Sequence, residues 1–112
     1  MIIGVIKQMD NLKNYFKGWI VGNFEPNLFK TNDIEIAIKR YKKGDKEEKH
    51  YHKIAKEFTI VIDGKILMNG NQVKKNQIFI VEPEVSNVFE ALTNATLLVI
   101  KTPSVVGDKY TE

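Results

Sequence analysis

The chain of 112 residues contains no cysteine. This absence excludes a disulfide framework, a thiolate zinc site and a cysteine nucleophile, and it is typical of a reducing cytoplasm, so we predict a cytoplasmic location. Long apolar runs are absent too: no segment approaches the roughly 18 apolar residues of a membrane span, and we expect no membrane partner. The apolar start at residues 1–6 is shorter than a secretory signal and has no leading positive charge.

A strong excess of charge of one sign is also missing. Lys and Arg number 17 against 14 Asp and Glu, which gives a net charge of +3. Bases and acids alternate, as between Lys42 and Lys49, and this indicates a solvated surface rather than a track for phosphates. We therefore expect no nucleic-acid partner. The alternative is a basic barrel that stacks single-stranded bases on its aromatic side chains.

What the chain does contain is a series of short β-branched and aromatic segments, and its length suits one domain over residues 1–112. In the segment 33–41 polarity alternates with a period of two, so its side chains divide between two faces. One face carries Ile34, Ile36 and Ile38, and the other carries Glu35, Ala37, Lys39 and Tyr41. Because a small barrel needs apolar filling, we expect the isoleucines to point inward. The alternative places Lys39 and Tyr41 in the lumen.

Turn residues separate the remaining strands, which are expected at 57–62, 65–68, 77–81, 87–92 and 96–102. Asp63-Gly64 predicts a tight hairpin between the first two, because Asp and Gly accept positive φ angles, and Asn69-Gly70-Asn71 predicts another turn. The regular spacing favours an all-β fold, a small antiparallel β-barrel of jelly-roll type. We expect residues 1–32 to form an N-terminal arm with edge strands, 33–103 the barrel core, and 104–112 a C-terminal tail.

Both histidines of the chain lie in the tripeptide His50-Tyr51-His52, and a carboxylate follows at Glu57. In an extended segment, residues two apart project to the same side, so both imidazoles point one way. A reversal between the tripeptide and Glu57 would place the carboxylate on the neighbouring antiparallel strand, facing the same space. Two imidazoles and one carboxylate predict a site for a divalent transition metal with open positions for water or substrate. The alternative is a pair of surface histidines in a charged loop.

The spacing around this tripeptide is more specific. The tripeptide follows Gly44 after five residues, Glu57 follows the tripeptide after four, and Gly64 follows Glu57 after six. This spacing reproduces the first signature motif of the cupin superfamily, which this chain resembles. The resemblance implies an antiparallel β-barrel with a metal at its wide end. It also implies that His50, His52 and Glu57 stand at three metal-ligand positions.

The second cupin motif is degenerate. Its glycine, proline, glycine, histidine and asparagine positions are taken here by Asn76, Glu82, Glu84, Asn87 and Ala91. Asn87 therefore stands where the resemblance implies a fourth ligand, a histidine. An amide oxygen is a harder donor than imidazole, so it favours manganese or iron(II), with zinc or nickel as further candidates. The alternative is a metal-free cupin whose histidines contact an organic ligand or only form hydrogen bonds.

The resemblance implies a metal-binding protein that acts on a small polar molecule, as a sugar-derivative isomerase or epimerase or as a dioxygenase. The alternative is a non-catalytic cupin that binds a small ligand as a sensor or accessory module. Small cupins often pair through N-terminal arms, so we expect a homodimer in which Trp19 lies in the core or at the contact. We expect Lys101, at the end of the last barrel strand, to lie in water; a cation inside the lumen for an anionic substrate is the alternative.

Overall fold

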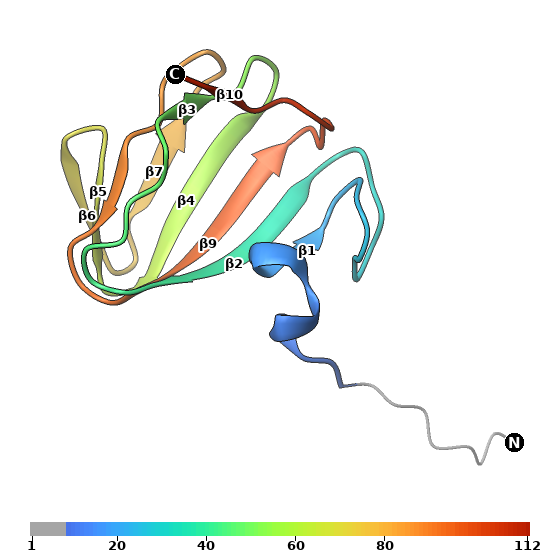
Figure 1. Cartoon of the computed structure of the whole chain (residues 1–112), viewed down its shortest axis with the longest axis horizontal. Coiled ribbons are helices and arrows are strands. Elements are labelled where there is room, and N and C mark those ends of the chain that lie inside the picture. Colours follow the sequence, from blue (N-terminus) through green and yellow to red (C-terminus); the bar gives the residue numbers. More distant parts are fainter. Residues whose placement is uncertain (1–8) are drawn as a thin grey trace, which may run out of the picture.

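The computed structural model describes residues 9–112, which fold into facing antiparallel β-sheets (Figure 1). The larger sheet has the strand order β1-β2-β9-β4-β7. Its strands are Trp19–Val21 (β1), Glu35–Tyr41 (β2), Ala95–Thr102 (β9), Lys56–Asp63 (β4) and Ile78–Val81 (β7). Two 3₁₀ turns, Leu12–Asn14 (η1) and Phe16–Gly18 (η2), lead into β1 at the sheet edge. The apolar start at residues 1–6 lies outside the described residues.

The opposite wall is made of two smaller sheets. One has the order β6-β5-β8 and the other pairs β10 with β3. Their strands are Asn71–Lys74 (β6), Lys65–Met68 (β5), Phe89–Ala91 (β8), Tyr110–Thr111 (β10) and His50–Tyr51 (β3). Single antiparallel bridges, His50 with Asn87 and Lys46 with Glu90, join the two sheets into one wall. The all-β antiparallel fold expected from the sequence is confirmed. No helix within residues 9–112 has the length and apolarity needed to cross a membrane.

The core lies between the walls. It is built from alternate residues of the long strands, such as Val61 on β4 and Leu97 on β9, which meet Ile66 and Phe89 from the opposite side. Along β9 the buried positions are every second residue, as a strand with one inward face requires. Toward the other end of β4 and β9 the inward residues are polar: Glu57 is registered with Lys101. The interior therefore changes from apolar to polar along one axis, and the polar end forms the site.

The expectation for the faces of β2 was wrong. Ala37 is fully buried and registered with Val99, while Lys39 is registered with the buried Leu97, so the face with Glu35, Lys39 and Tyr41 points inward. The isoleucine face points outward. The reason is that the outer surface of the large sheet is apolar as well, so hydrophobicity alone does not separate inside from outside.

The hairpin predicted at Asp63-Gly64 was also wrong. Strand β4 pairs with β7 and β9, whereas β5 pairs with β6 and β8, so this turn carries the chain from one sheet to the other. Gly64 still needs its glycine: its φ is 84°, and a side chain there would collide with the backbone of Asn94. The two-residue hairpin lies one turn later, at Asn69-Gly70 between β5 and β6, where both residues have positive φ.

Candidate functional site

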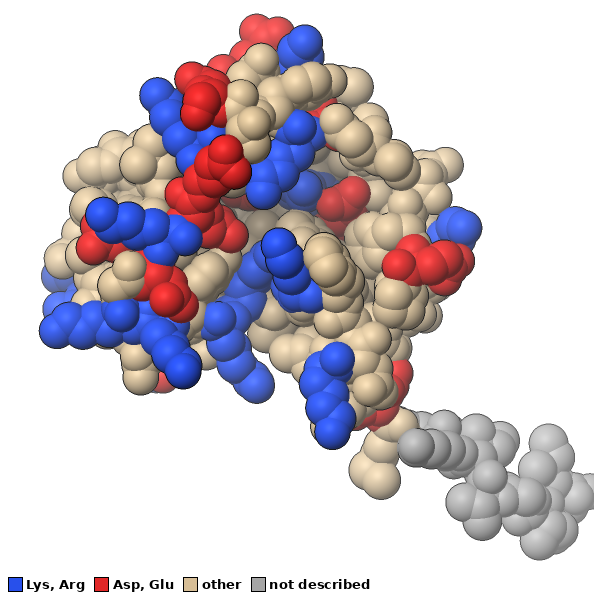
Figure 2. All heavy atoms as spheres, in the orientation of Figure 1, with Lys and Arg blue, Asp and Glu red and all other residues tan. Residues whose placement is uncertain are grey.

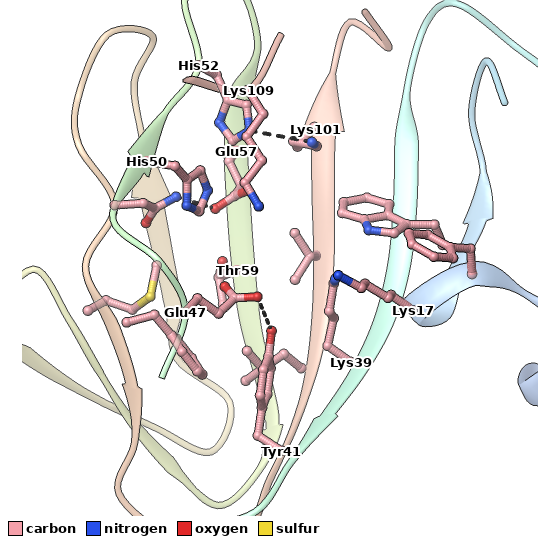
Figure 3. Close-up of a pocket in the computed structure, with 17 residues that line it drawn as sticks. Lys17, Lys39, Tyr41, Glu47, His50, His52, Glu57, Thr59, Lys101 and Lys109 are labelled. Atoms are coloured by element: carbon pink, nitrogen blue, oxygen red, sulfur yellow. Dashed lines mark hydrogen bonds between the residues drawn. The ribbon is translucent and has the colours of Figure 1, made fainter. Parts of the chain in front are cut away.

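A cavity of about 250 Å³ lies between the two walls (Figure 3). His50, His52, Glu57 and Asn87 all line it, and each of these side chains is at least nine-tenths buried. The four residues singled out by the two cupin motifs thus share one space. They come from both walls, because Glu57 belongs to the large sheet and the other three to the opposite side.

The pairing that brings them together differs from the expectation. The tripeptide was expected beside the strand of Glu57, and this was wrong: β3 pairs with β10, while β4 lies between β7 and β9. His50 is instead bridged to Asn87, with the two backbone N–H groups donating to the two carbonyls over 3.3 Å and 2.6 Å. Glu57 meets the histidines across the cavity rather than along a sheet.

The imidazole of His50 is oriented by the backbone. Its Nδ1 lies 2.9 Å from the carbonyl oxygen of Glu48, so Nδ1 carries the proton and donates it. The lone pair of the neutral ring is then on Nε2 of His50. The ring of His52 packs edge-on against that of His50, with centroids 5.1 Å apart and an interplanar angle of 81°.

His52 is held neutral. Burial, followed by the positive charge of Lys101, lowers its pKa to about 4. The ammonium of Lys101 lies 3.5 Å from Nε2 of His52 and is positioned to donate to that lone pair. Lys101 was expected in water, and this was wrong: its side chain is 16% exposed and forms an ion pair of 3.3 Å with Glu35. It is a cation inside the lumen.

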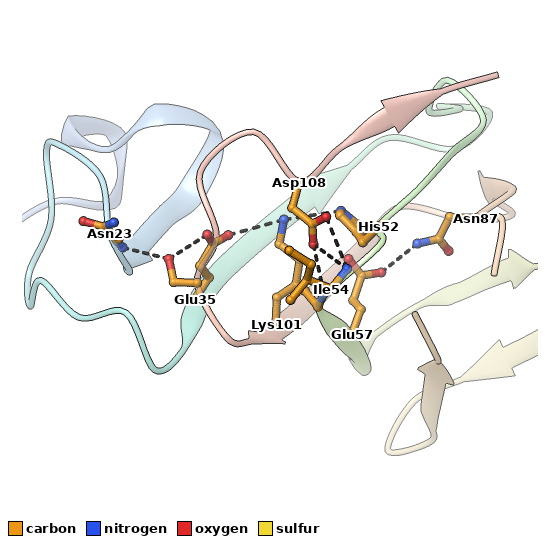
Figure 4. Close-up of polar contacts among 10 residues, drawn as sticks. Asn23, Glu35, His52, Ile54, Glu57, Asn87, Lys101 and Asp108 are labelled. Atoms are coloured by element: carbon orange, nitrogen blue, oxygen red, sulfur yellow. Dashed lines mark hydrogen bonds and ion pairs between the residues drawn. The ribbon is translucent and has the colours of Figure 1, made fainter. Parts of the chain in front are cut away.

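The carboxylate of Glu57 is buried without a matching cation. Its hydrogen-bond partner is the Nδ2 group of Asn87, which donates to Oε2 over 2.9 Å (Figure 4). Within residues 9–112 no lysine, arginine or histidine forms an ion pair with Glu57, although Lys101 is its registered neighbour. The Oδ1 atom of Asn87 is buried and has no hydrogen-bond partner. A buried charge normally pairs with an opposite charge or a metal, so the missing partner is informative.

Two features outside the motifs hold these groups in place. The carboxylate of Asp108 accepts hydrogen bonds of 2.9–3.3 Å from the backbone N–H groups of Lys53, Ile54 and Ala55, the turn that joins the tripeptide to β4 (Figure 4). Burial alone would raise the pKa of Asp108, but these bonds outweigh it and lower that pKa. On the other side, Ser104 donates to Glu35 over 2.7 Å and fixes the carboxylate that pairs with Lys101.

The other end of the cavity is aromatic and basic. Trp19, Lys39 and Tyr41 line it, and the phenol of Tyr41 donates to Glu47 over 2.8 Å. Burial, followed by the negative charge of Glu47, raises the pKa of Tyr41 far above its usual range, so the phenol keeps its proton. The ammonium groups of Lys39 and Lys101 lie 4.9 Å and 4.7 Å from the centroid of the Trp19 ring.

The backbone supports the register of the degenerate second motif. The two glycine positions of that motif are occupied by Asn76 and Glu84, and both residues have left-handed backbones with φ of 72° and 71°. Few non-glycine residues adopt this conformation. The chain therefore has left-handed turns at both glycine positions of the motif, and the same register places Asn87 in the cavity.

The arrangement does not amount to a formed metal site. Within the described residues, no group of three His, Asp or Glu side chains stands ready to hold an ion. Two of the donors already have partners: Lys101 faces Nε2 of His52, and Asn87 donates to Glu57. The donor types suit a divalent ion, because the set consists of two imidazoles, a carboxylate and an amide oxygen without a partner.

No protein-family model matches the chain, and no curated protein matches it by sequence. Solved structures do match. An uncharacterised conserved protein with a double-stranded β-helix domain from Klebsiella pneumoniae superposes with a TM-score of 0.69 at 15% identity, over 99% of this chain and 96% of that one. The chain has the fold of the cupin superfamily. At the level of the fold, this confirms the resemblance drawn from the first motif.

Other solved structures are similar to this chain as well. KdgF from Halomonas sp. matches with a TM-score of 0.60 at 15% identity, over 65% of this chain and 72% of that one. Oxalate decarboxylase from Bacillus subtilis, studied for its Mn(II) centres, matches with a TM-score of 0.62 at 18% identity. That match covers 72% of this chain and 24% of the decarboxylase, so this chain spans about a quarter of that protein's length.

Sequence reasoning missed much of the cavity. Lys39 and Tyr41 were expected outside, and Asp108, Glu47 and Lys109 carried no motif. The strand pattern offered one usable signal, because Glu35, Lys39 and Tyr41 share a face and polar residues that recur on one face mark a polar lumen as well as a solvated side. For Asp108 there was no signal, since a single aspartate in a terminal segment has many roles.

Proposed function

We propose that this chain is a metal-binding cupin whose ion is held by His50, His52 and Glu57, with Asn87 as a fourth, weaker donor. The observation that carries the proposal is the buried carboxylate of Glu57, which has no cationic partner within residues 9–112. The tautomer of His50 adds to it, because the hydrogen bond from Nδ1 to Glu48 leaves Nε2 free. A carbonyl acceptor for the second ring nitrogen is the usual partner of a metal-binding histidine.

Manganese or iron(II) suits this donor set best. Two imidazoles with one carboxylate leave coordination positions open, and an amide oxygen adds a hard donor. The Mn(II) centres of the similar oxalate decarboxylase support this choice. When bound, the ion would polarise a carbonyl or hydroxyl oxygen of the substrate. The chain's own contribution is to hold His52 neutral through burial and to keep Glu57 oriented through the N–H of Asn87.

The substrate we propose is a small polar molecule, because a cavity of about 250 Å³ between two sheets admits nothing larger. Isomerisation or epimerisation of a sugar derivative and dioxygenation remain the two candidate reactions. The similar structures include a decarboxylase and a dioxygenase, which is the spread of activities expected when one fold carries many sites.

One observation favours a second candidate, a non-catalytic cupin that binds a small ligand without metal. The ammonium of Lys101 lies 3.5 Å from Nε2 of His52, the atom that a metal would need. In this alternative, Lys101 serves as the permanent cation of the site. Metal binding requires that the ammonium of Lys101 move away from Nε2 of His52. The ammonium can then remain paired with the carboxylate of Glu35.

Titration with MnCl₂ of metal-free protein made without a histidine tag tests the proposal. We expect the wild type to bind one equivalent of Mn(II), measured by the loss of the electron paramagnetic resonance signal of the free ion. The variant Glu57→Gln should bind at least about a hundredfold more weakly, because it removes the only carboxylate of the set.

Glu82→Gln is the matched control, since Glu82 is exposed and pairs with Lys56 outside the cavity. Wild-type protein that takes up neither Mn(II) nor iron(II) would end the metal proposal in favour of the non-catalytic cupin. Equal affinity in the two glutamine variants would place the ion elsewhere.

The proposal also includes a homodimer in the cytoplasm. The lack of cysteine supports the location. The outer face of the large sheet supports the dimer: Ile62, Ile78 and Ile80 are about half exposed on it. Trp19, expected in the core or at a dimer contact, is partly buried against the core and lines the cavity.

A further inference from the structure

Four lysines line the cavity: Lys17, Lys39, Lys101 and Lys109. They come from separate parts of the chain, the η2 turn, β2, β9 and the segment before β10. Lys39 and Lys101 are partly buried inside, and Lys17 and Lys109 are exposed at the opening. In the space-filling view, lysine and arginine side chains stand around the hollow in the middle of this face (Figure 2).

Two carboxylates, Glu47 and Glu57, line the same cavity, so the four lysines outnumber them. Within residues 9–112, Lys101 forms an ion pair with Glu35, and Lys17, Lys39 and Lys109 form none. Burial lowers the pKa of Lys39; Glu47 opposes this, while the charges of Lys109, Lys101 and Lys17 lower it further. The cations therefore lie close enough to repel one another inside a space shielded from water. Such a cluster is unfavourable unless an anion shares it.

Trp19 lies beside two of these lysines. The ammonium groups of Lys39 and Lys101 are both within 5 Å of its ring centroid. An aromatic face attracts a cation but carries no charge, so it positions the two lysines without neutralising them. The two ammonium groups are thereby held ready for a ligand that does carry negative charge.

We infer that the cavity binds a small organic anion whose carboxylate or phosphate group lies between Lys39 and Lys101 beside Trp19. This inference rests on the proposed function in that it names the chemical class of the ligand of the same site. The walls limit the ligand to about the size of the 250 Å³ cavity. Lys17 and Lys109 at the opening would attract the anion from solution.

Trp19 is the only tryptophan of the chain, so its fluorescence reports directly on this part of the cavity. Metal-free protein is titrated with inorganic phosphate and with succinate at constant ionic strength set by sodium chloride. We expect a saturable change in Trp19 emission. Lys39→Met should raise the dissociation constant about tenfold or more, and Lys39→Arg, which keeps the charge, should stay within about threefold.

Lys75→Met is the matched control, because Lys75 is exposed and does not line the cavity; it should bind both anions like the wild type. Circular dichroism and the melting temperature establish that every variant is folded. An unsaturable response equal to that of chloride, or wild-type affinity in Lys39→Met, would overturn the inference.

The titration is repeated on protein loaded with Mn(II), so the two proposals fail separately. Uptake of Mn(II) without anion binding in either form leaves the metal proposal standing and removes this one. Anion binding by a protein that takes up no metal removes the metal proposal and keeps the anion site. Lys39 belongs to neither the proposed metal ligands nor their hydrogen-bond partners, so its substitution tests the anion alone.

Discussion

At the scale of single residues, Lys101 is the most consequential side chain of the cavity. It is registered between Glu35 and Glu57, pairs with Glu35, faces Nε2 of His52 and lies over Trp19. A metal ion at His52 and the ammonium of Lys101 compete for the same lone pair and repel each other. A bound organic anion, by contrast, is attracted by both the metal ion and the ammonium of Lys101. Lys101 therefore couples the two proposed ligands.

The first prediction follows from this competition. In the double variant Lys101→Met/Glu35→Gln, the affinity for Mn(II) should rise about tenfold, because no ammonium faces His52 and no buried carboxylate is left unpaired. Paramagnetic resonance of free Mn(II) measures the change. Glu35→Gln alone is the control, since it keeps the ammonium beside His52. Unchanged or weaker binding in the double variant would show that Lys101 does not compete with the ion.

The sequence predicted the identity of the key residues better than their surroundings. His50, His52, Glu57 and Asn87 were found because the spacing of a motif records which side chains share a site. Lys101 and Lys39 were placed in water because lysine is mostly exposed and nothing in a single sequence reveals a neighbouring aromatic ring or a buried carboxylate. Whether the four motif residues bind metal stays a prediction.

At the scale of elements, the turn between β3 and β4 decides how the tripeptide meets Glu57. Its three backbone N–H groups are held by Asp108, from the segment that leads into β10. The segment 104–112, expected as a tail, therefore reaches the site, and Tyr110–Thr111 pairs with β3. Without Asp108 the turn would lose the acceptor for three donors.

Asp108→Ala should lower the free energy of unfolding by about 2–3 kcal/mol, because it leaves three backbone N–H groups, of which that of Ala55 is buried, without their acceptor. Urea denaturation at neutral pH measures the loss, and Asp33→Ala, at an exposed residue before β2, is the control. The pKa of Asp108 is lowered from 3.8, so its contribution is complete above that pH and is lost as the pH falls through the lower folded value. The difference between wild type and variant should shrink accordingly in acid; a difference that grows there would contradict this account.

The strands themselves were largely predictable, and their pairing was not. The expected strands at 57–62, 77–81 and 96–102 correspond to β4, β7 and β9, since alternation and β-branched residues are local signals. The Asp63-Gly64 turn was assigned to a hairpin because turn chemistry predicts a reversal of direction but does not identify the partner strand. Pairing depends on contacts between distant segments, which a single sequence does not record.

At the scale of the whole molecule, the outer face of the large sheet carries a continuous apolar surface. Strand register aligns two apolar rows across β2, β9, β4 and β7. The rows are Ile36, Ile100, Phe58 and Ile80, and Ile38, Leu98, Ile60 and Ile78. Neither row contains a charged side chain. A continuous apolar surface of this kind is typical of a subunit contact, and a two-fold axis would lay one such face against its copy.

The wild type should therefore sediment as a dimer in analytical ultracentrifugation, and Ile78→Lys/Ile80→Lys should sediment as a monomer of unchanged fold. Two buried charges on each side of an apolar contact prevent association. Val106→Lys, at an apolar residue that is 75% exposed elsewhere, should remain a dimer. A wild type that is monomeric at about 100 μM, well above the dissociation constants of stable dimers, would rule out this contact.

The position of β9 in the chain has a consequence for folding during synthesis. This strand is the shared partner of β2 and β4, yet it follows both in the chain. On the ribosome, β2 and β4 must wait without their central neighbour until residues 95–102 have left the exit tunnel. During that interval the edges of β2 and β4 that later pair with β9 have no hydrogen-bond partner, and they are open to chaperones and to other nascent chains.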